Sequence, residues 1–301
     1  MSKPTMKIAG VTVPAELKGE PLLKWMKENL ATLIAEKKAA TKESDAIMVT
    51  VDINTKLVVD KEGVLRKAAD DYVPNLTEAT EVLCVINTTN WLDSHGDVHI
   101  PGLWKKCLKE NKYLSHLQEH KQMFTHIISD TSRGYTEKIA WKDLGYEAMG
   151  TTEALVFATP FTGRNAYMEE QYRKGYVKNH SVGMRYVTLK FCVNRPEDEY
   201  YKEEYANWTQ YIDQVINREA AEEQGFFWAV LEAKIVEGSA VPVGSNIITP
   251  TLGFKSAQPV ITTGKIEPPT GTQVKEEKTT GGTQSSINYD KVADHLIKSF
   301  T

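Results

Sequence analysis

The sequence has few cysteines, with three among 301 residues. Cys84, Cys107 and Cys192 are widely spaced, form no Cys-x-x-Cys pair and have no histidine at the spacing of metal ligands. Neither a disulfide framework nor a zinc site is therefore expected, and no other cofactor is predicted. Cys84 lies within an apolar run, so it is expected in the core rather than as a nucleophile.

Long apolar runs and a strong charge of one sign are also missing. No run approaches the roughly 18 residues that a membrane-spanning helix requires. The polar residues 1–7 are not followed by the apolar core of a secretory signal. The net charge is −4 and no long lysine and arginine stripe stands out, which argues against nucleic acid as the main partner. The sequence predicts a soluble protein of a cytoplasm-like compartment, bound to neither membrane nor nucleic acid.

Several common enzyme signatures are absent as well. The sequence contains no P-loop, no Gly-x-Gly-x-x-Gly, no His-Glu-x-x-His and no Gly-x-Ser-x-Gly motif. The common nucleotide-binding enzymes, zinc proteases of that motif and α/β-hydrolases are disfavoured accordingly. The 41% hydrophobic content allows one sizeable core with extensions, or two small domains.

Composition divides the chain into four regions. Residues 1–45 form a polar leader with an amphipathic helix, expected to dock on the body or on a partner. Residues 46–80 form a connection with one strand, over 49–53, and many turns. Residues 81–254 form the body, interrupted by an acidic helical insertion over 195–225. Residues 255–301 are predicted to be a flexible tail, because the stretch 256–283 is too poor in large apolar groups to fold, and a short terminal helix is an option over 289–300.

The body reads as an α+β structure rich in strands. Alternating or continuous apolar residues predict strands over 81–87, 135–141, 154–158, 180–193 and 226–236. A short helix is predicted after Pro101, and a second over 164–175 with Tyr167, Met168 and Tyr172 facing inward. Several short strands joined by turns, with few helices, favour a closed or nearly closed β-barrel wrapped by helices.

Three separated segments carry the residue types that an activated hydroxyl needs. His120 follows a strand-like segment, Ser181 begins a strand, and Glu237 closes the strand predicted over 226–236. A serine oxygen can attack, an imidazole can take its proton, and an acid can orient the imidazole. Each residue alone has a plainer reading: a structural histidine, a surface hydroxyl and a solvated carboxylate.

The neighbours of Ser181 bear on the same hypothesis. His180 should point to the opposite face of the strand, so it is a poor base for Ser181. Gly183 lies two residues further on the same face, where a missing side chain would leave room for a substrate backbone. Arg185 could assist backbone N–H groups in stabilising an oxyanion.

Taken together, these segments resemble the prohead maturation proteases of tailed bacteriophages, which are distant relatives of herpesvirus assemblins. The resemblance covers roughly residues 80–250 and rests on four segments in order: Asp93-x-x-Gly96-Asp97-x-x-x-Pro101-Gly102, Glu119-His120, Ser181-Val182-Gly183, and Val236-Glu237-Gly238-Ser239-Ala240-Val241-Pro242. The chain departs from the family pattern at Lys121, where an acid or amide is more usual, at Gly238, where an aliphatic residue is usual, and in its long acidic insertion.

The resemblance implies a serine endopeptidase on a β-barrel, with Ser181 as nucleophile, His120 as general base and Glu237 as the third member. Its implied substrates are a scaffold protein, the N-terminal segment of the major capsid protein and the protease itself. It would act inside an immature viral capsid assembled in the host cytoplasm, with self-association an open option. One alternative is a non-enzymatic internal scaffold or core protein that keeps the barrel as an assembly module. Another is a different hydrolase with an enclosed small-molecule pocket.

Overall fold

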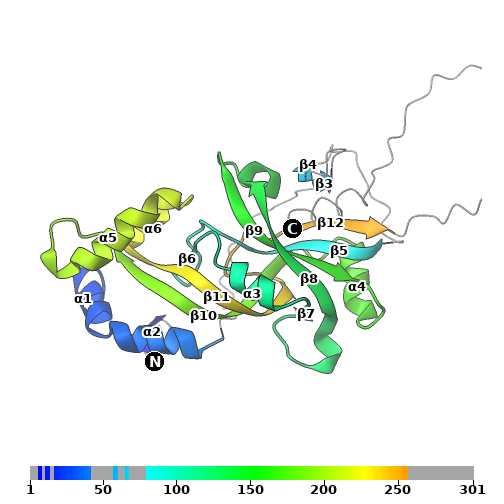
Figure 1. Cartoon of the computed structure of the whole chain (residues 1–301), viewed down its shortest axis with the longest axis horizontal. Coiled ribbons are helices and arrows are strands. Elements are labelled where there is room, and N and C mark those ends of the chain that lie inside the picture. Colours follow the sequence, from blue (N-terminus) through cyan, green and yellow to red (C-terminus); the bar gives the residue numbers. More distant parts are fainter. Residues whose placement is uncertain are drawn as a thin grey trace, which may run out of the picture.

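The computed structural model describes residues 6–8, 11–13, 17–41, 57–59, 65–67 and 79–256. Its main element is an eight-stranded sheet, accompanied in the described part of the chain by six α-helices (Figure 1). The chain therefore has a mixed α/β structure. The helices are α1 Glu20–Glu28, α2 Leu30–Ala39, α3 Lys105–Glu110, α4 Ala166–Arg173, α5 Lys202–Tyr211 and α6 Arg218–Gln224.

The main sheet runs in the order β10-β11-β7-β8-β9-β5-β12, with the short β6 also paired to β11. Strand β11 lies parallel to β6 and β7, and the other pairs are antiparallel. The strands are β5 Ala79–Thr88, β6 Asp97–His99, β7 Leu114–Gln118, β8 Ile127–Ala140, β9 Thr151–Pro160, β10 Asn179–Val193, β11 Phe226–Val241 and β12 Thr251–Ser256.

The remaining elements are short. Strand β1 Met6–Ile8 pairs with β2 Val11–Val13, and β3 Leu57–Val59 pairs with β4 Leu65–Lys67. Among residues 79–256, four 3-10 helices connect larger elements: η2 Phe124–His126, η3 Trp141–Leu144, η4 Glu199–Tyr201 and η5 Ile212–Gln214. The strand expected over 49–53 and nearly all of the tail expected over 255–301 lie outside the described residues.

The described sheet is not closed, because it ends at β10 on one side and at β12 on the other. The five predicted body strands are confirmed, but two details of the prediction were wrong. Strand β11 continues to Val241, so Glu237 lies inside the strand and does not close it. Tyr167 points outward and is 62% exposed, because the buried face of α4 is set by Met168 and Tyr172, four residues apart.

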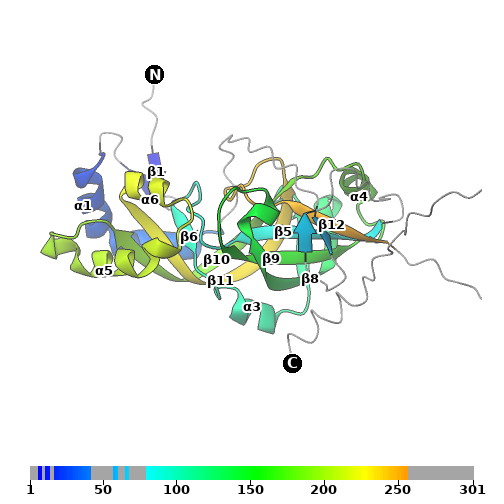
Figure 2. The same ribbon diagram turned by 90° about the horizontal axis from the view of Figure 1, so that it is seen from above.

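Strands β10 and β11 are the longest elements in the described residues, and they form a hairpin. Its distal half (residues 191–193 with 226–229) and its proximal half (residues 179–184 with 235–241) lie in different surroundings. Helices α1, α2, α5 and α6 gather around its distal half, whereas α4 lies at the other end of the sheet (Figures 1 and 2). Side chains of alternating positions there enter two separate clusters. One contains Phe191, Phe226 and Trp228 with α1 and α2, and the other contains Cys192 and Phe227 with α5. This burial on both faces explains why residues 191–193 and 226–230 are apolar without alternation.

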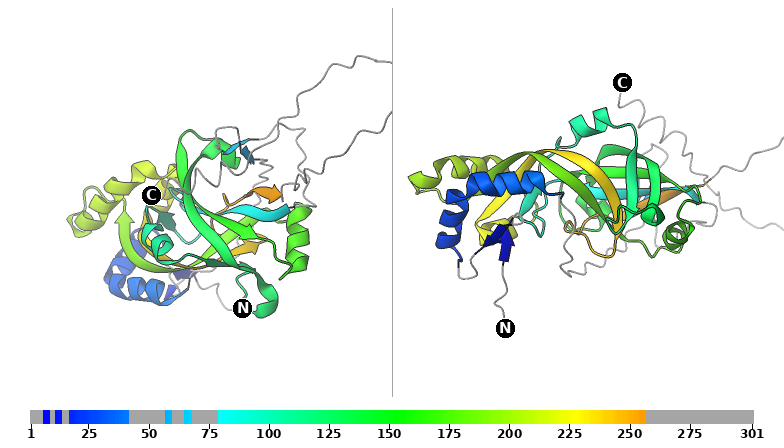
Figure 3. Two further views of the ribbon diagram at one scale, coloured as in Figure 1. Left: turned by 45° about the vertical axis from the view of Figure 1, so that its right-hand side comes forward. Right: turned by 90° about the horizontal axis from the view of Figure 1, so that it is seen from below.

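The leader docks on the body of the protein as two helices, since the expected single helix is interrupted at Asn29. An ion pair holds each helix, and it is half-buried for α1 and buried for α2. Lys27 Nζ of α1 lies 2.5 Å from the Glu204 carboxylate of α5, and Lys37 Nζ of α2 lies 2.8 Å from the Asp97 carboxylate. Figure 3 shows α2 running alongside the hairpin.

The proximal half of the hairpin curves over the rest of the sheet. Val182 and Met184 of β10 face inward and share a core with Cys84 of β5 and Phe157 of β9. Cys84 is fully buried, as expected. A Cβ atom at Gly238 would lie 2.7 Å from the Phe157 ring, so glycine is required for this close packing. The opposite face of the proximal half carries polar residues.

Candidate active site

The turn after β7 carries His120 in a strained backbone conformation. Glu119 and His120 have φ angles of 54° and 56°, in the left-handed region that residues with a side chain rarely adopt. Such residues cost about 1–3 kcal/mol each and persist where the surroundings hold them. Here the Glu119 N–H donates to the Ala240 carbonyl at 2.9 Å, and the His120 N–H donates to Ser239 Oγ at 3.1 Å. Strand β11 therefore holds the turn in place.

The imidazole of His120 contacts the carboxylate of Glu237. The distance from His120 Nδ1 to Glu237 Oε1 is 2.6 Å, and the two side chains are 7% and 4% exposed. An ionised carboxylate only accepts hydrogen bonds, so Nδ1 carries the hydrogen and Nε2 is the basic nitrogen of the neutral ring. This is the tautomer that a general base for a serine requires.

Ser181 lies on the strand face that carries this pair. In the β10–β11 register, Ser181 is opposite Ser239 and Gly183 is opposite Glu237. Side chains directly opposite each other have Cβ atoms about 4.5–5.5 Å apart, and residues two apart share a face. Ser181, which is 5% exposed, therefore neighbours Ser239, whose hydroxyl contacts His120.

The absent side chain of Gly183 leaves room for Glu237. A Cβ atom at Gly183 would lie only 2.0 Å from Glu237 Oε1. The space that we expected a substrate backbone to occupy is therefore filled by the acid. A β-bulge lies next to this pair, because Gly183 pairs with Glu237 while Met184 already pairs with Ile235. Bulges of this kind redirect side chains and are frequent beside active sites.

Arg185 lies two residues beyond Gly183 on β10, on the side away from the Ser181–Ser239 pair. Its side chain is exposed, and in the register it is opposite Lys234. Four residues along a strand separate it from Ser181 by about 13 Å.

A buried chain of hydrogen bonds lies on the other face of the same strands. Tyr172 Oη of α4 lies 3.1 Å from His116 Nε2 of β7 and 3.0 Å from His180 Nε2 of β10. His116 Nδ1 lies 2.7 Å from Thr159 Oγ1, and His180 Nδ1 lies 2.9 Å from the Thr249 carbonyl oxygen. His180 thus faces away from Ser181, and the chain ties together the strands that precede His120 and carry Ser181.

The acceptors in this chain determine where its protons lie. The Thr249 carbonyl can only accept, so His180 Nδ1 donates and its Nε2 accepts from the Tyr172 hydroxyl. Tyr172 Oη in turn accepts from His116 Nε2. This arrangement requires a neutral His180 ring and is compatible with a neutral His116 ring. Burial lowers the pKa of His180 to about 4 and lowers the pKa of His116 well below its usual value, in agreement with that arrangement.

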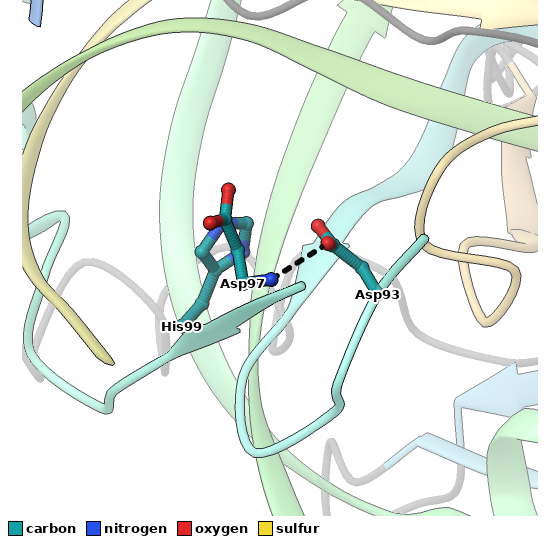
Figure 4. Close-up of side chains that lie close together, drawn as sticks. All are labelled: Asp93, Asp97 and His99. Atoms are coloured by element: carbon teal, nitrogen blue, oxygen red, sulfur yellow. Dashed lines mark hydrogen bonds between the residues drawn. The ribbon is translucent and has the colours of Figure 1, made fainter. Parts of the chain in front are cut away.

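A second polar cluster lies at the distal side of the sheet, where Asp93, Asp97 and His99 hold potential ligand atoms within 4.8 Å of one another (Figure 4). These atoms already have structural partners. Asp93 Oδ1 accepts from the backbone N–H groups of His95 and Asp97, and His99 Nδ1 lies 3.0 Å from Asn87 Oδ1. The Asp97 carboxylate pairs with the Lys37 ammonium and accepts a hydrogen bond from the Tyr186 hydroxyl. A cation therefore occupies this cluster already, in the form of Lys37.

No family model matches the chain, and neither a curated protein nor a solved structure was found to match it. None of the helices in the described ranges has the length and apolar content needed to cross a membrane.

Sequence reasoning missed Ser239 and the chain of residues that Tyr172 links. Ser239 could have been found, because it lies two residues after Glu237 and strand alternation places both on one face. The predicted end of the strand at Val236 concealed this relation. The contacts of Tyr172 join residues 56 and 8 positions away, and no local pattern marks them.

Proposed function

We propose that the chain is a serine endopeptidase with Ser181 as nucleophile, His120 as general base and Glu237 as the residue that orients the base. The observation that carries this proposal is the 2.6 Å contact between His120 Nδ1 and Glu237 Oε1, on a strand face shared with Ser181. An acid paired with Nδ1 leaves Nε2 to act on a hydroxyl.

In the proposed reaction, Ser181 Oγ attacks the carbonyl carbon of a peptide bond and His120 Nε2 takes the hydroxyl proton. The Glu237 carboxylate stabilises the imidazolium that forms. His120 then gives the proton to the leaving amine, and water releases the acyl group from Ser181 by the same steps. Backbone N–H groups would stabilise the oxyanion. We assign no part to Arg185, because it lies too far along the strand.

The surface beside His120 supports a peptide substrate. The connection from β7 to β8 exposes the apolar side chains of Met123 and Phe124, and Phe124 is 87% exposed. Exposed apolar groups next to a reactive site suit the side chains of an extended polypeptide. The resemblance to prohead proteases makes a scaffold protein, the N-terminal segment of a major capsid protein and the chain itself the proposed substrates. The proposed place of action is the interior of an immature capsid.

The proposal includes a barrel architecture for the body. Two features support it: the inner core shared by β10 and β5, and the contact between the two ends of the sheet. At that contact the His180 N–H donates to Thr249 Oγ1 at 3.1 Å, two residues before β12 begins. A side chain thus bridges the two ends where a closed barrel would have a strand ladder.

The alternative is a non-enzymatic internal scaffold or core protein, and one observation favours it. Ser181 and the side chain of His120 are both largely buried, so a substrate could reach them only after the surrounding residues move. A site that never opens would be a structural polar cluster.

The deciding experiment is labelling of the full chain with a fluorophosphonate, a reagent for activated serine hydroxyls. We expect one adduct on Ser181 by intact-mass and peptide analysis, and none in Ser181→Ala or His120→Gln. Ser94→Ala, which removes an exposed serine, is the matched control and should label like wild type. Absence of a Ser181 adduct in the wild type would support the scaffold alternative. Incubation with scaffold and capsid proteins then tests the substrates.

A further inference from the structure

We propose that Ser239 is a positioning residue that joins the base and the acid of the candidate active site. This inference deepens the proposed function and rests on it, because His120 is a base and Glu237 its orienting acid only if that function holds. The geometry behind it stands independently. Ser239 is fully buried in β11 and lies opposite Ser181 in the strand register.

The hydroxyl of Ser239 donates one hydrogen bond and accepts another. Its hydrogen is donated to Glu237 Oε2 at 2.6 Å, and its oxygen accepts the backbone N–H of His120 at 3.1 Å. A carboxylate can only accept and an N–H can only donate, so the direction of both hydrogen bonds is fixed. A group that both donates and accepts is therefore needed here, and alanine or valine cannot replace it.

The first contact selects the carboxylate geometry. Because Ser239 holds Oε2 of Glu237, the other oxygen, Oε1, is directed at His120 Nδ1. Without the hydroxyl, the carboxylate could rotate about its terminal bond, which has a broad torsional preference. The orientation of the imidazole would then be less well defined.

The second contact holds the turn that carries the base. His120 has a left-handed backbone, and its N–H has Ser239 Oγ as partner. Loss of that partner would leave a donor unsatisfied in a strained turn, which favours relaxation of Glu119 and His120 to ordinary backbone angles. Such a relaxation would move the imidazole away from Glu237.

The same geometry excludes Ser239 as the nucleophile. Its proton goes to Glu237, and its oxygen meets His120 through the main chain. Ser239 is a hydroxyl that holds the pair, while Ser181, opposite it, is the one that the proposal makes reactive.

The test compares wild type, Ser239→Ala and Ser239→Thr in the full chain, with two measurements. Nuclear magnetic resonance of the His120 imidazole reports the hydrogen-bonded Nδ1 proton, whatever the activity. The rate of fluorophosphonate labelling reports reactivity of Ser181. We expect Ser239→Ala to lose the Nδ1 proton signal through exchange and to label about 10-fold to 100-fold more slowly, as when other orienting residues are removed. Ser239→Thr keeps a hydroxyl and should therefore retain much of the Nδ1 proton signal and of the labelling rate.

A matched control separates positioning from stability. Thr152→Ala also removes a buried strand hydroxyl, one that donates to the Thr89 carbonyl at 2.9 Å in another part of the sheet. It should leave the His120 signal and the labelling rate unchanged. A Ser239→Ala protein that keeps the His120 Nδ1 proton signal and the wild-type labelling rate would overturn the proposal. A wild type that shows the Ser239-dependent signal but no Ser181 adduct would overturn the proposed function alone and leave this inference standing.

Discussion

The two halves of the β10–β11 hairpin use the same backbone pairing for different purposes. In the distal half both faces are apolar and are covered by helices, with Phe191 and Trp228 on one side and Phe227 on the other. In the proximal half one face joins the inner core, and the other carries Ser181, Gly183, Glu237 and Ser239. One half is held by packing, whereas the polar face of the other is organised by hydrogen bonds. Substitutions in the two halves should therefore affect different measurements.

The largest expected effect is on reactivity in the proximal half. Glu237→Gln keeps the shape of the side chain, but an amide can favour the wrong imidazole tautomer, and labelling of Ser181 should slow by about 10³-fold to 10⁴-fold. Glu232→Gln makes the same chemical change on the same strand, where Glu232 pairs with the exposed Lys106 at 3.3 Å. That control should label like wild type. Equal effects of the two variants would contradict the assignment of Glu237.

The next effect is on stability in the distal half. Trp228 is fully buried, and its ring lies 4.7 Å from that of Phe191. Trp228→Ala should lower the free energy of unfolding by about 3–5 kcal/mol, measured by urea denaturation. The labelling rate of the folded fraction should remain within a factor of two or so of wild type. A parallel loss of labelling would show that the halves are coupled.

A pH-dependent effect is expected from the buried histidine chain. The pKa of His180 is about 4 in the folded protein, against an ordinary value of 6.5. Above pH 6.5 the ring is neutral in both states, so pH has no effect through it. Between pH 6.5 and 4 the unfolded chain takes up a proton that the folded chain refuses, and stability falls as the pH falls. The difference of 2.5 pKa units corresponds to a loss of about 3 kcal/mol by pH 4.

The measurement is urea denaturation at several pH values for wild type and His180→Gln. The variant should be less stable at pH 7.5 but less sensitive to acid. Burial raises the pKa of Glu137 to about 7, which acts in the opposite direction over part of this range because the folded state then binds the proton more readily. Glu137 is present in both proteins, so its contribution cancels in their difference, which reports His180 and its coupling to His116. Parallel stability curves would contradict the prediction.

The smallest effect on stability is expected at the surface beside the site. Phe124→Ser should change the free energy of unfolding by no more than about 0.5 kcal/mol, since the ring is exposed. If this surface receives apolar side chains of a peptide, cleavage should show a raised KM with kcat nearly unchanged. Tyr167→Ser, another exposed aromatic substitution, is the control and tests whether any exposed ring has this effect. An unchanged KM in Phe124→Ser would remove this surface from substrate binding.

Local sequence patterns predicted much of the strand content, because the alternation of apolar residues in strands depends only on neighbours along the chain. They placed the end of β11 five residues too early, since the polar Glu237 and Ser239 interrupt the apolar run. That error hid Ser239, although the site itself explains why polar residues lie inside the strand. The polar residues of the candidate site interrupt the apolar run by which the strand is recognised in the sequence.

The geometry of the candidate site depends on contacts that no local pattern contains. His120 and Glu237 are 117 residues apart and meet because β7 lies parallel to β11. The left-handed backbone of His120 has no glycine or asparagine to signal it. The role of Gly183 also became clear only from its cross-strand neighbour. The sequence could name candidate residues, but their arrangement required the fold.

Lys37 has a consequence for processing of the N-terminus. Its ammonium, almost completely buried, neutralises an Asp97 carboxylate that has no exposure at all. Trimming the chain beyond α2 would strand that negative charge inside the protein, and breaking a buried pair in this way typically destabilises by about 3–5 kcal/mol. Helices α1 and α2 are therefore part of the folded body, and a maturation event that discarded them would also destabilise the distal half of the hairpin.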